Sequence, residues 1–209
     1  LAILASVIGW LHDHPDDAGK FGIICPVHYD SLFNVETKVK YRTMYQKITD
    51  SMKERILFMV LDVPPYAPWA SLSQFAAPLK NYGRVLCAQL PLSANADFDT
   101  LRRAGFDNIG FLLEPPSRNG AQDSDIRIPG EARQFIAKAK KHLIRQTFAL
   151  GVNDPMTAAI LTKASVRYIS GDAVHQAIPQ PAGNIDFYKN DMFRVWQALR
   201  HTRQPTARQ

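Results

Sequence analysis

The sequence predicts an α/β fold in which parallel strands alternate with helices, arranged as a (β/α)8 TIM-type barrel of which about six strands lie in this chain. Short apolar runs recur along the sequence, each followed by a helix-sized segment, and a helix-like run, Leu1–Leu11, comes first. Such alternation makes a parallel sheet with right-handed crossovers. Polar residues directly follow two of the apolar runs, in Gly151-Val152-Asn153-Asp154 and in Ser170-Gly171-Asp172. In parallel α/β proteins these positions face a ligand.

A doubly wound open sheet is the competing architecture. No glycine-rich phosphate-binding loop follows any predicted strand, which disfavours the nucleotide-binding form of that sheet. A complete barrel needs eight strands. Because the sequence starts with Leu1 rather than Met, within an apparent helix, we expect the first two strands to precede this chain. Residues 1–209 are then one barrel domain that lacks its N-terminal part.

The predicted strands are short and continuously apolar, which is typical of strands buried on both faces. They are Phe21–Cys25, Arg55–Leu61, Arg84–Gln89, Asn108–Leu113, Thr147–Leu150 and Val166–Ile169.

Helices are predicted from capping residues and from apolar side chains at helical spacing. Asn34 caps a helix whose apolar face comprises Val35, Val39, Met44, Ile48 and Met52. Asp154 followed by Pro155 is a typical helix start. The other predicted helices are Ser71–Tyr82, Asp97–Gly105, Gly130–His142, Pro155–Lys163 and one that carries Ile185, Met192, Val195, Trp196 and Leu199.

The net charge of +6 raises the question of nucleic-acid binding. The basic residues gather in Lys138–His142 and in the tail from Arg194 to Arg208. Aromatic side chains are not interleaved with them as a base-stacking platform requires. We therefore interpret the basic residues as solvated helix surface and expect no nucleic-acid partner.

Cysteine usage and hydropathy bear on the compartment. Cys25 and Cys87 lie inside strand-like runs and have no metal-binding spacing, so we expect buried free thiols in a cytoplasmic protein. The longest apolar stretch, Leu1–Leu11, is too short to cross a bilayer, and we expect no membrane insertion.

Several motifs carry a further signal. The run Leu101-Arg102-Arg103-Ala104-Gly105-Phe106-Asp107-Asn108-Ile109 resembles the Leu-x-x-Leu-x-Phe-Asp-x-Ile run of bacterial EAL domains, the cyclic-di-GMP phosphodiesterase family. Likewise, Ala149–Asn153 stands where that family has Ala-Glu-Gly-Val-Glu, and Ser170-Gly171 where it has Gln-Gly. The resemblance extends over nearly the whole chain and implies a barrel of EAL type.

The same resemblance implies that the family's catalytic residues are replaced. His28 stands at a metal-ligand Asn, Met59 at a metal-binding Glu, Asp62 at a second acid and Gly110 at the catalytic Lys. Other family acids fall on Gln89, Leu90, Leu112, Leu150 and Asn153. Two-metal phosphodiester cleavage needs a cluster of hard oxygen ligands, which Met, Leu and Gly do not supply. The implied domain is degenerate, with no enzymatic activity, no metal and no cofactor.

Five polar residues remain at predicted strand ends and form a candidate ligand or partner face: His28, Asp62, Gln89, Asn153 and Asp172. Each also has a structural interpretation. For His28 this is a hydrogen-bonded structural histidine, and for Asp62, which precedes two prolines, a turn residue. Asn153 and Asp172 are expected to point into the barrel mouth.

Three functions follow as hypotheses. The first is a bacterial signalling or regulatory domain that acts through a protein partner or neighbouring domains, with a homodimer left open and with the aromatic loop Pro65–Trp69 as one contact. The second is a receptor that binds cyclic-di-GMP or another nucleotide without cleaving it. No cationic residue falls at the matched mouth positions, so we expect this binding to be weak or absent. The third is an enzyme rebuilt around His28, Asp62, Asn153 and Asp172.

Overall fold

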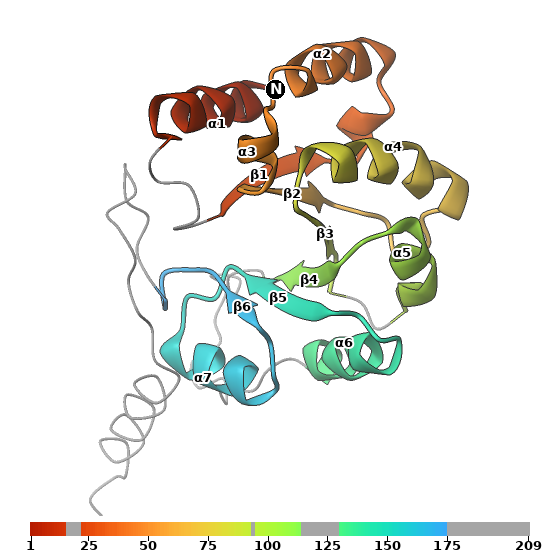
Figure 1. Ribbon diagram of the computed structural model, residues 1–209. Coiled ribbons are helices and arrows are strands. Elements are labelled where there is room, and N and C mark those ends of the chain that lie inside the picture. Colours follow the sequence, from red (N-terminus) through yellow and green to blue (C-terminus); the bar gives the residue numbers. More distant parts are fainter. Residues whose placement is uncertain (16–21, 93–94, 114–129, 175–209) are drawn as a thin grey trace, which may run out of the picture.

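The computed structural model describes residues 1–15, 22–92, 95–113 and 130–174, which form one six-stranded sheet flanked by helices (Figure 1). The strands are β1 (Ile23–His28), β2 (Ile56–Leu61), β3 (Val85–Leu90), β4 (Asn108–Leu112), β5 (Gln146–Leu150) and β6 (Tyr168–Ile169). The predictions for Pro179, for the loop 114–128, and for the last helix and basic tail lie outside the described residues.

The sheet is entirely parallel, and its spatial order is β1-β2-β3-β4-β5-β6. A doubly wound sheet reverses direction at a switch point, and this order does not. Parallel crossovers are right-handed as a rule, and crossovers that all advance in one direction put the helices on one face of a sheet that curls. Figure 1 shows this curled sheet with the helices outside it. The predicted fold class, an incomplete TIM-type barrel, is confirmed.

The α-helices of the described residues are α1 (Ala2–Asp13), α2 (Val35–Tyr45), α3 (Asp50–Lys53), α4 (Trp69–Tyr82), α5 (Phe98–Ala104), α6 (Gly130–Lys141) and α7 (Pro155–Lys163), with a 3-10 turn, η2 (Asp30–Leu32). Caps stand at the predicted starts of three helices. Asn34 Oδ1 accepts a hydrogen bond from Thr37 N–H at 2.9 Å, and Asp154 Oδ2 accepts one from Thr157 N–H at 2.6 Å. The third cap, Asp97, begins α5. These bonds satisfy amide groups that the first helical turn leaves unpaired.

The main hydrophobic core lies between the outer face of the sheet and the helices. Phe98 of α5 and Phe111 of β4 both pack edge-on against Phe135 of α6, with ring centroids 5.0 and 5.1 Å apart. The three rings are fully buried. Aromatic burial of this kind contributes most per residue to the core, and it fixes α5 and α6 against the middle of the sheet.

Two expectations about burial are wrong. The first strand was expected to be buried on both faces, but Ile24 is 50% exposed because it points to the inner face, which the described helices do not cover. The helix from Asn34 was expected to continue to Met52 with Val35 and Val39 in its apolar face. Instead α2 ends at Tyr45, and the two valines are 76% and 62% exposed.

The reason lies in the rotation of α2 about its axis. Tyr41 and Tyr45 are the buried residues of this helix, and at 100° per residue they lie about 120° around the helix axis from Val35 and Val39. Burying two tyrosine rings removes more apolar area from water than burying two valines. The aromatic pair therefore decides which side of α2 faces the sheet.

Candidate functional site

The carboxyl ends of the strands carry all five predicted polar residues. His28 ends β1, Asp62 follows β2 and Gln89 is the penultimate residue of β3. Asn153 and Asp172 lie in the segments that follow β5 and β6. Because the strands are parallel, these positions share one edge of the sheet. The role of this edge as a ligand or partner face stays a prediction.

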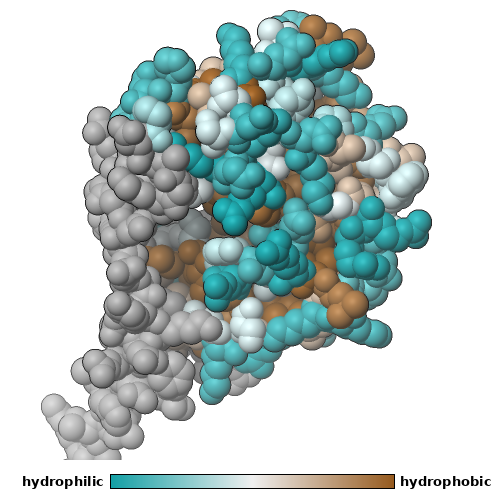
Figure 2. Space-filling view, viewed as in Figure 1, coloured by the Kyte–Doolittle hydropathy of each residue, from teal (hydrophilic) through white to brown (hydrophobic). Residues whose placement is uncertain are grey.

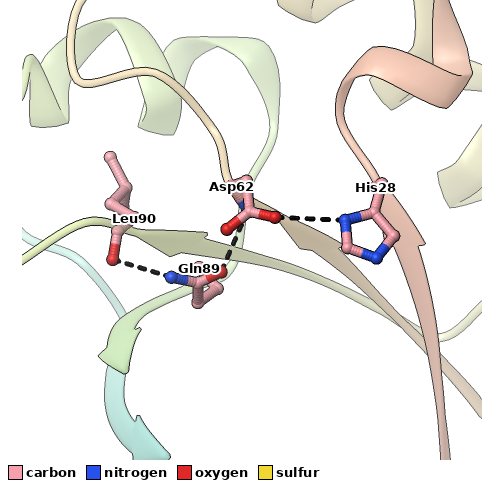
Figure 3. A network of polar contacts seen from close by, with 4 residues as sticks. All are labelled: His28, Asp62, Gln89 and Leu90. Atoms are coloured by element: carbon pink, nitrogen blue, oxygen red, sulfur yellow. Dashed lines mark hydrogen bonds and ion pairs between the residues drawn. The ribbon is translucent and has the colours of Figure 1, made fainter. Parts of the chain in front are cut away.

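Three of the five residues form one polar network (Figure 3). Asp62 Oδ2 lies 3.1 Å from His28 Nδ1. The Asp62 N–H donates to Gln89 Oε1 at 2.9 Å, and Gln89 Nε2 donates to the Leu90 carbonyl at 3.0 Å. His28 and Asp62 side chains are 65% and 69% exposed, whereas Gln89 is 5% exposed. A buried amide therefore holds the turn that presents an exposed carboxylate to the imidazole.

The backbone of Asp62 has φ of 56°, in the left-handed region that non-glycine residues seldom adopt. Asp is among the few side chains that tolerate this region. His28, expected to be a hydrogen-bonded histidine, and Asp62, expected to be a turn residue, thus contact each other. His28 and Asp62 are 34 residues apart in sequence, and only the pairing of β1 with β2 brings them together.

Asn153 and Asp172 form a separate pair. Asn153 Oδ1 accepts a hydrogen bond from the Asp172 backbone N–H at 3.2 Å. Val152 N–H donates to the Ser170 carbonyl at 3.0 Å, which ties the same two segments together. Gly171 is needed here because a Cβ on it would clash with the Val152 backbone. No hydrogen bond within the described residues joins this pair to the network of His28.

The inner face of the sheet is apolar where the EAL resemblance implies chemistry. Met59 is 5% exposed and packs in a small cluster with Cys87 and Phe148. Gly110 pairs with Phe148 across β4 and β5, and a Cβ at position 110 would clash with the Phe148 ring and carbonyl. The Met59 thioether and the Phe148 ring thus occupy the inner face of the sheet at positions 59 and 110.

A cavity of about 550 Å³, which the sequence did not predict, opens on this inner face. Arg84 and Arg145 line it, and each directly precedes a strand, β3 and β5 respectively. Asn108, 4% exposed, also lines it and donates toward Cys87 Sγ at 3.7 Å. In the space-filling view of Figure 2, hydrophobic side chains appear in the middle of the molecule, with hydrophilic ones around them.

Burial also governs the two thiols. It raises the pKa of Cys25 from its ordinary value of 9.0 to about 11 and that of Cys87 to about 12. Both thiols are free and buried, as expected. Within the described ranges, no three His, Cys, Asp or Glu side chains come together as a metal site would require.

Of the helices in the described part of the chain, none combines the length and the apolarity that a bilayer-spanning segment requires.

Comparison with known proteins finds the fold among solved structures. No model of a known protein family matches this chain, and no curated protein matches it. The Bacillus subtilis YkuI protein, which has an EAL domain and was solved with its substrate c-di-GMP and calcium, aligns with a TM-score of 0.61 at 12% identity. The alignment covers 96% of this chain and 48% of YkuI, so the chain spans about half of that protein.

A second similar structure is the EAL domain of Xanthomonas citri FimX in complex with c-diGMP. It aligns with a TM-score of 0.59 at 15% identity, over 89% of this chain and 71% of that one. At these identities the likeness concerns the fold. The described residues have an EAL-like fold, in agreement with the architecture that the sequence motifs implied.

Proposed function

We propose that this chain is an EAL-like domain of cyclic-di-GMP signalling that does not cleave the nucleotide and acts as a regulatory, protein-interaction module. The observation that carries the proposal is the packing of Phe148 over Gly110 and against Met59. These are positions where the resemblance places a catalytic lysine and a metal-binding glutamate.

The chemistry explains why this packing matters. Two divalent ions, held by oxygen ligands, would have to generate the hydroxide and stabilise the leaving oxygen. A carboxylate at position 59 would be buried against Cys87 and Phe148, where an unpaired charge is strongly disfavoured. A lysine at position 110 has no room for its Cβ. The apolar cluster therefore replaces the reaction centre and stabilises the inner face of the sheet.

The polar residues that remain do not rebuild a two-metal site. His28 and Asp62 contact each other, and the Asn153 side chain accepts a hydrogen bond from the Asp172 backbone. Together they offer a single imidazole and two separated carboxylates. The proposal of an enzyme rebuilt around these four residues is therefore less well supported than a domain that works by contact.

The activity test uses purified protein with cyclic-di-GMP and either Mg²⁺ or Mn²⁺, with products separated by chromatography. We expect no linear dinucleotide above a protein-free control. Metal-dependent turnover that disappears in both Asp62→Ala and Asn153→Ala would overturn the proposal. A trace activity that survives in both variants would point to a contaminating enzyme.

A non-hydrolysing receptor is the second candidate, because both similar EAL structures were solved with c-di-GMP. Without metals, a dianionic nucleotide needs direct Arg or Lys contacts. The strand-end residues include Asp62 and Asp172 but no Arg or Lys. The arginines of the inner cavity, Arg84 and Arg145, precede their strands and lie at the opposite edge of the sheet. We expect calorimetry to give a Kd above about 100 µM, weaker than about −5.5 kcal/mol. Low-micromolar binding would favour the receptor over the protein-interaction module.

A further inference from the structure

A groove of about 540 Å³ runs between α2 and α4 on the outer surface, away from the strand ends and from the inner cavity. The two helices lie side by side in Figure 1, and Tyr45 of α2 stacks on Tyr82 of α4 with ring centroids 5.0 Å apart. Both helices follow neighbouring parallel strands, so they run in the same general direction. The groove is therefore an elongated depression between two helices.

The floor of the groove is aromatic and apolar. Tyr41, Tyr45 and Tyr82 form a continuous stack, with Tyr41 and Tyr45 centroids 5.7 Å apart. Phe75 and Leu79 of α4 complete the floor. Burial raises the pKa of Tyr41 and of Tyr45, so these two rings are neutral across the physiological range. Tyr41, Tyr45, Phe75 and Leu79 are each at most 6% exposed, so the floor is apolar but largely buried.

The rim of the groove is cationic on the side of α2. Lys38 and Arg42 line it and are exposed, and within the described residues neither has a carboxylate partner. Lys38 Nζ lies over the Phe33 ring, 5.6 Å from its centroid, which leaves its charge open to solvent. No Asp or Glu is among the described residues that line the groove. A ligand with negative charge would meet attraction and no opposing carboxylate.

The exposed side of α2 extends this surface. Val35, Lys38, Val39 and Arg42 are spaced i, i+3, i+4 and i+7, so they form one stripe along the helix. The stripe alternates exposed valines, 76% and 62% exposed, with the two cations. The fold uses neither valine in its core. A stripe of this spacing is the pattern by which one helix contacts another.

We infer that the groove and this stripe, together the α2–α4 surface, bind a short acidic amphipathic helix of a partner protein. The inference rests on the proposed function as a protein-interaction module and identifies its contact surface. Aliphatic side chains of the partner at i, i+4 and i+7 enter the groove and cover the valines, while its Glu or Asp residues pair with Lys38 and Arg42. α2 has 11 residues, about 16 Å of helix, which matches three turns of a partner.

A nucleic acid is less well matched to the same surface. Base stacking requires free ring faces, but Tyr41 and Tyr45 are 5% and 6% exposed and stack on each other. The exposed valines add apolar area that a phosphate backbone would not use. The acidic helix matches the exposed valines and the cationic rim together.

The test uses a fluorescein-labelled, acetylated 16-residue helical peptide with Leu at i, i+4 and i+7 and Glu at the flanking positions. A twin peptide carries Lys in place of every Glu. Fluorescence anisotropy with the whole chain should show saturable binding of the acidic peptide only, weakening as NaCl rises from about 50 to 300 mM because exposed charge pairs are screened.

The decisive variants reverse the rim charges. Lys38→Glu with Arg42→Glu should weaken binding at least tenfold, and Val39→Asp alone should weaken it several-fold. The matched control is Lys141→Glu with Lys163→Glu, which makes the same charge change on α6 and α7 and should bind like the unaltered chain. Circular dichroism and thermal unfolding confirm that each variant is folded.

Three results would overturn the inference. They are equal binding of the Lys-containing twin, equal binding by the rim and control variants, and tight binding of single-stranded RNA that only the rim variant loses. Cyclic-di-GMP turnover is assayed on the same preparations. Turnover would contradict the proposed function, whereas the three binding results contradict only the α2–α4 surface. A failure of the α2–α4 surface is therefore distinguishable from a failure of the proposed function.

Discussion

At the scale of single residues, Asp62 combines an uncommon backbone with an exposed carboxylate. Its φ of 56° is held by the bond from its N–H to Gln89. Residues in sparsely populated backbone regions persist where surrounding bonds determine them, and they cluster at functional sites. Here the strain serves to aim the carboxylate at His28.

This strain predicts the outcome of two substitutions that both remove the carboxylate. Asp62→Gly should leave the free energy of unfolding within about 1 kcal/mol, because glycine adopts positive φ without steric cost. Asp62→Val should lower it by about 1–3 kcal/mol, because a β-branched residue is strained there. Urea unfolding of the two variants measures the difference. Equal stabilities would show that the backbone relaxes at this turn.

The buried thiols predict a pH dependence of stability. In the unfolded chain both cysteines ionise near pH 9, whereas in the folded protein their pKa values are about 11 and 12. Above pH 9 the unfolded state therefore binds fewer protons than the folded state, and stability falls as pH rises. Each thiol contributes a slope of roughly 1.4 kcal/mol per pH unit up to its folded pKa.

The measurement is urea unfolding between pH 8.5 and 10.5 in reducing buffer. Cys25→Ala combined with Cys87→Ala should flatten the slope, even though the double variant is less stable throughout. Tyr29, Tyr41 and Tyr45, whose pKa values are also raised by burial, contribute to the slope that remains. Identical slopes with and without the cysteines would contradict the prediction.

At the scale of elements, the inner side of β4 and β5 depends on a glycine. Gly110 lets the two strands pair while the Phe148 ring covers the position where a side chain would stand. A single added methyl group must displace the ring or spread the strands. The apolar cluster of Met59, Cys87 and Phe148 on the inner face therefore depends on the glycine at position 110.

We therefore expect Gly110→Ala to destabilise the protein by about 1–3 kcal/mol through overpacking. Gly9→Ala is the control, since Gly9 lies within α1 and a Cβ there meets nothing within 4 Å. That change should raise stability by about 0.5–1 kcal/mol through helix propensity. Thermal unfolding compares both with the unaltered chain, and a neutral Gly110→Ala would show that Phe148 moves freely.

At the scale of the whole molecule, helices cover the outer face of the curled sheet and leave part of the inner face exposed. Ile24 and Tyr168, which line the inner cavity, are 50% and 51% exposed. Exposed apolar area next to Arg84 and Arg145 should attract an amphipathic anion. The inner cavity is therefore an apolar part of the sheet that a small dye molecule can reach.

The dye anilinonaphthalene sulfonate tests this arrangement, because its fluorescence rises on contact with apolar surface. The folded chain should enhance the fluorescence, and Ile24→Ser with Tyr168→Ser should reduce the enhancement at least twofold. Leu143→Ser is the control, since Leu143 is 79% exposed and is not among the residues that line this cavity. Equal loss in the control would assign the dye to scattered surface residues instead.

What the sequence determined by itself is local or periodic. The caps at Asn34, Asp97 and Asp154 act over three residues, and the alternation of apolar runs with helices suffices to specify a parallel sheet. The polar residues near the ends of five strands were also identifiable, because parallel strands end at one edge. These features depend on neighbours along the chain.

What only the tertiary structure decided depends on neighbours across the sheet. The meeting of His28 with Asp62, the packing of Phe148 over Gly110, and the rotation of α2 that exposes Val35 all join residues or surfaces far apart in sequence. The first follows from the pairing of β1 with β2. The other two are outcomes of a competition for buried area, in which aromatic rings prevail over smaller side chains. The apolar periodicity of one segment does not reveal which of its side chains are buried, because that depends on the segments that pack against it.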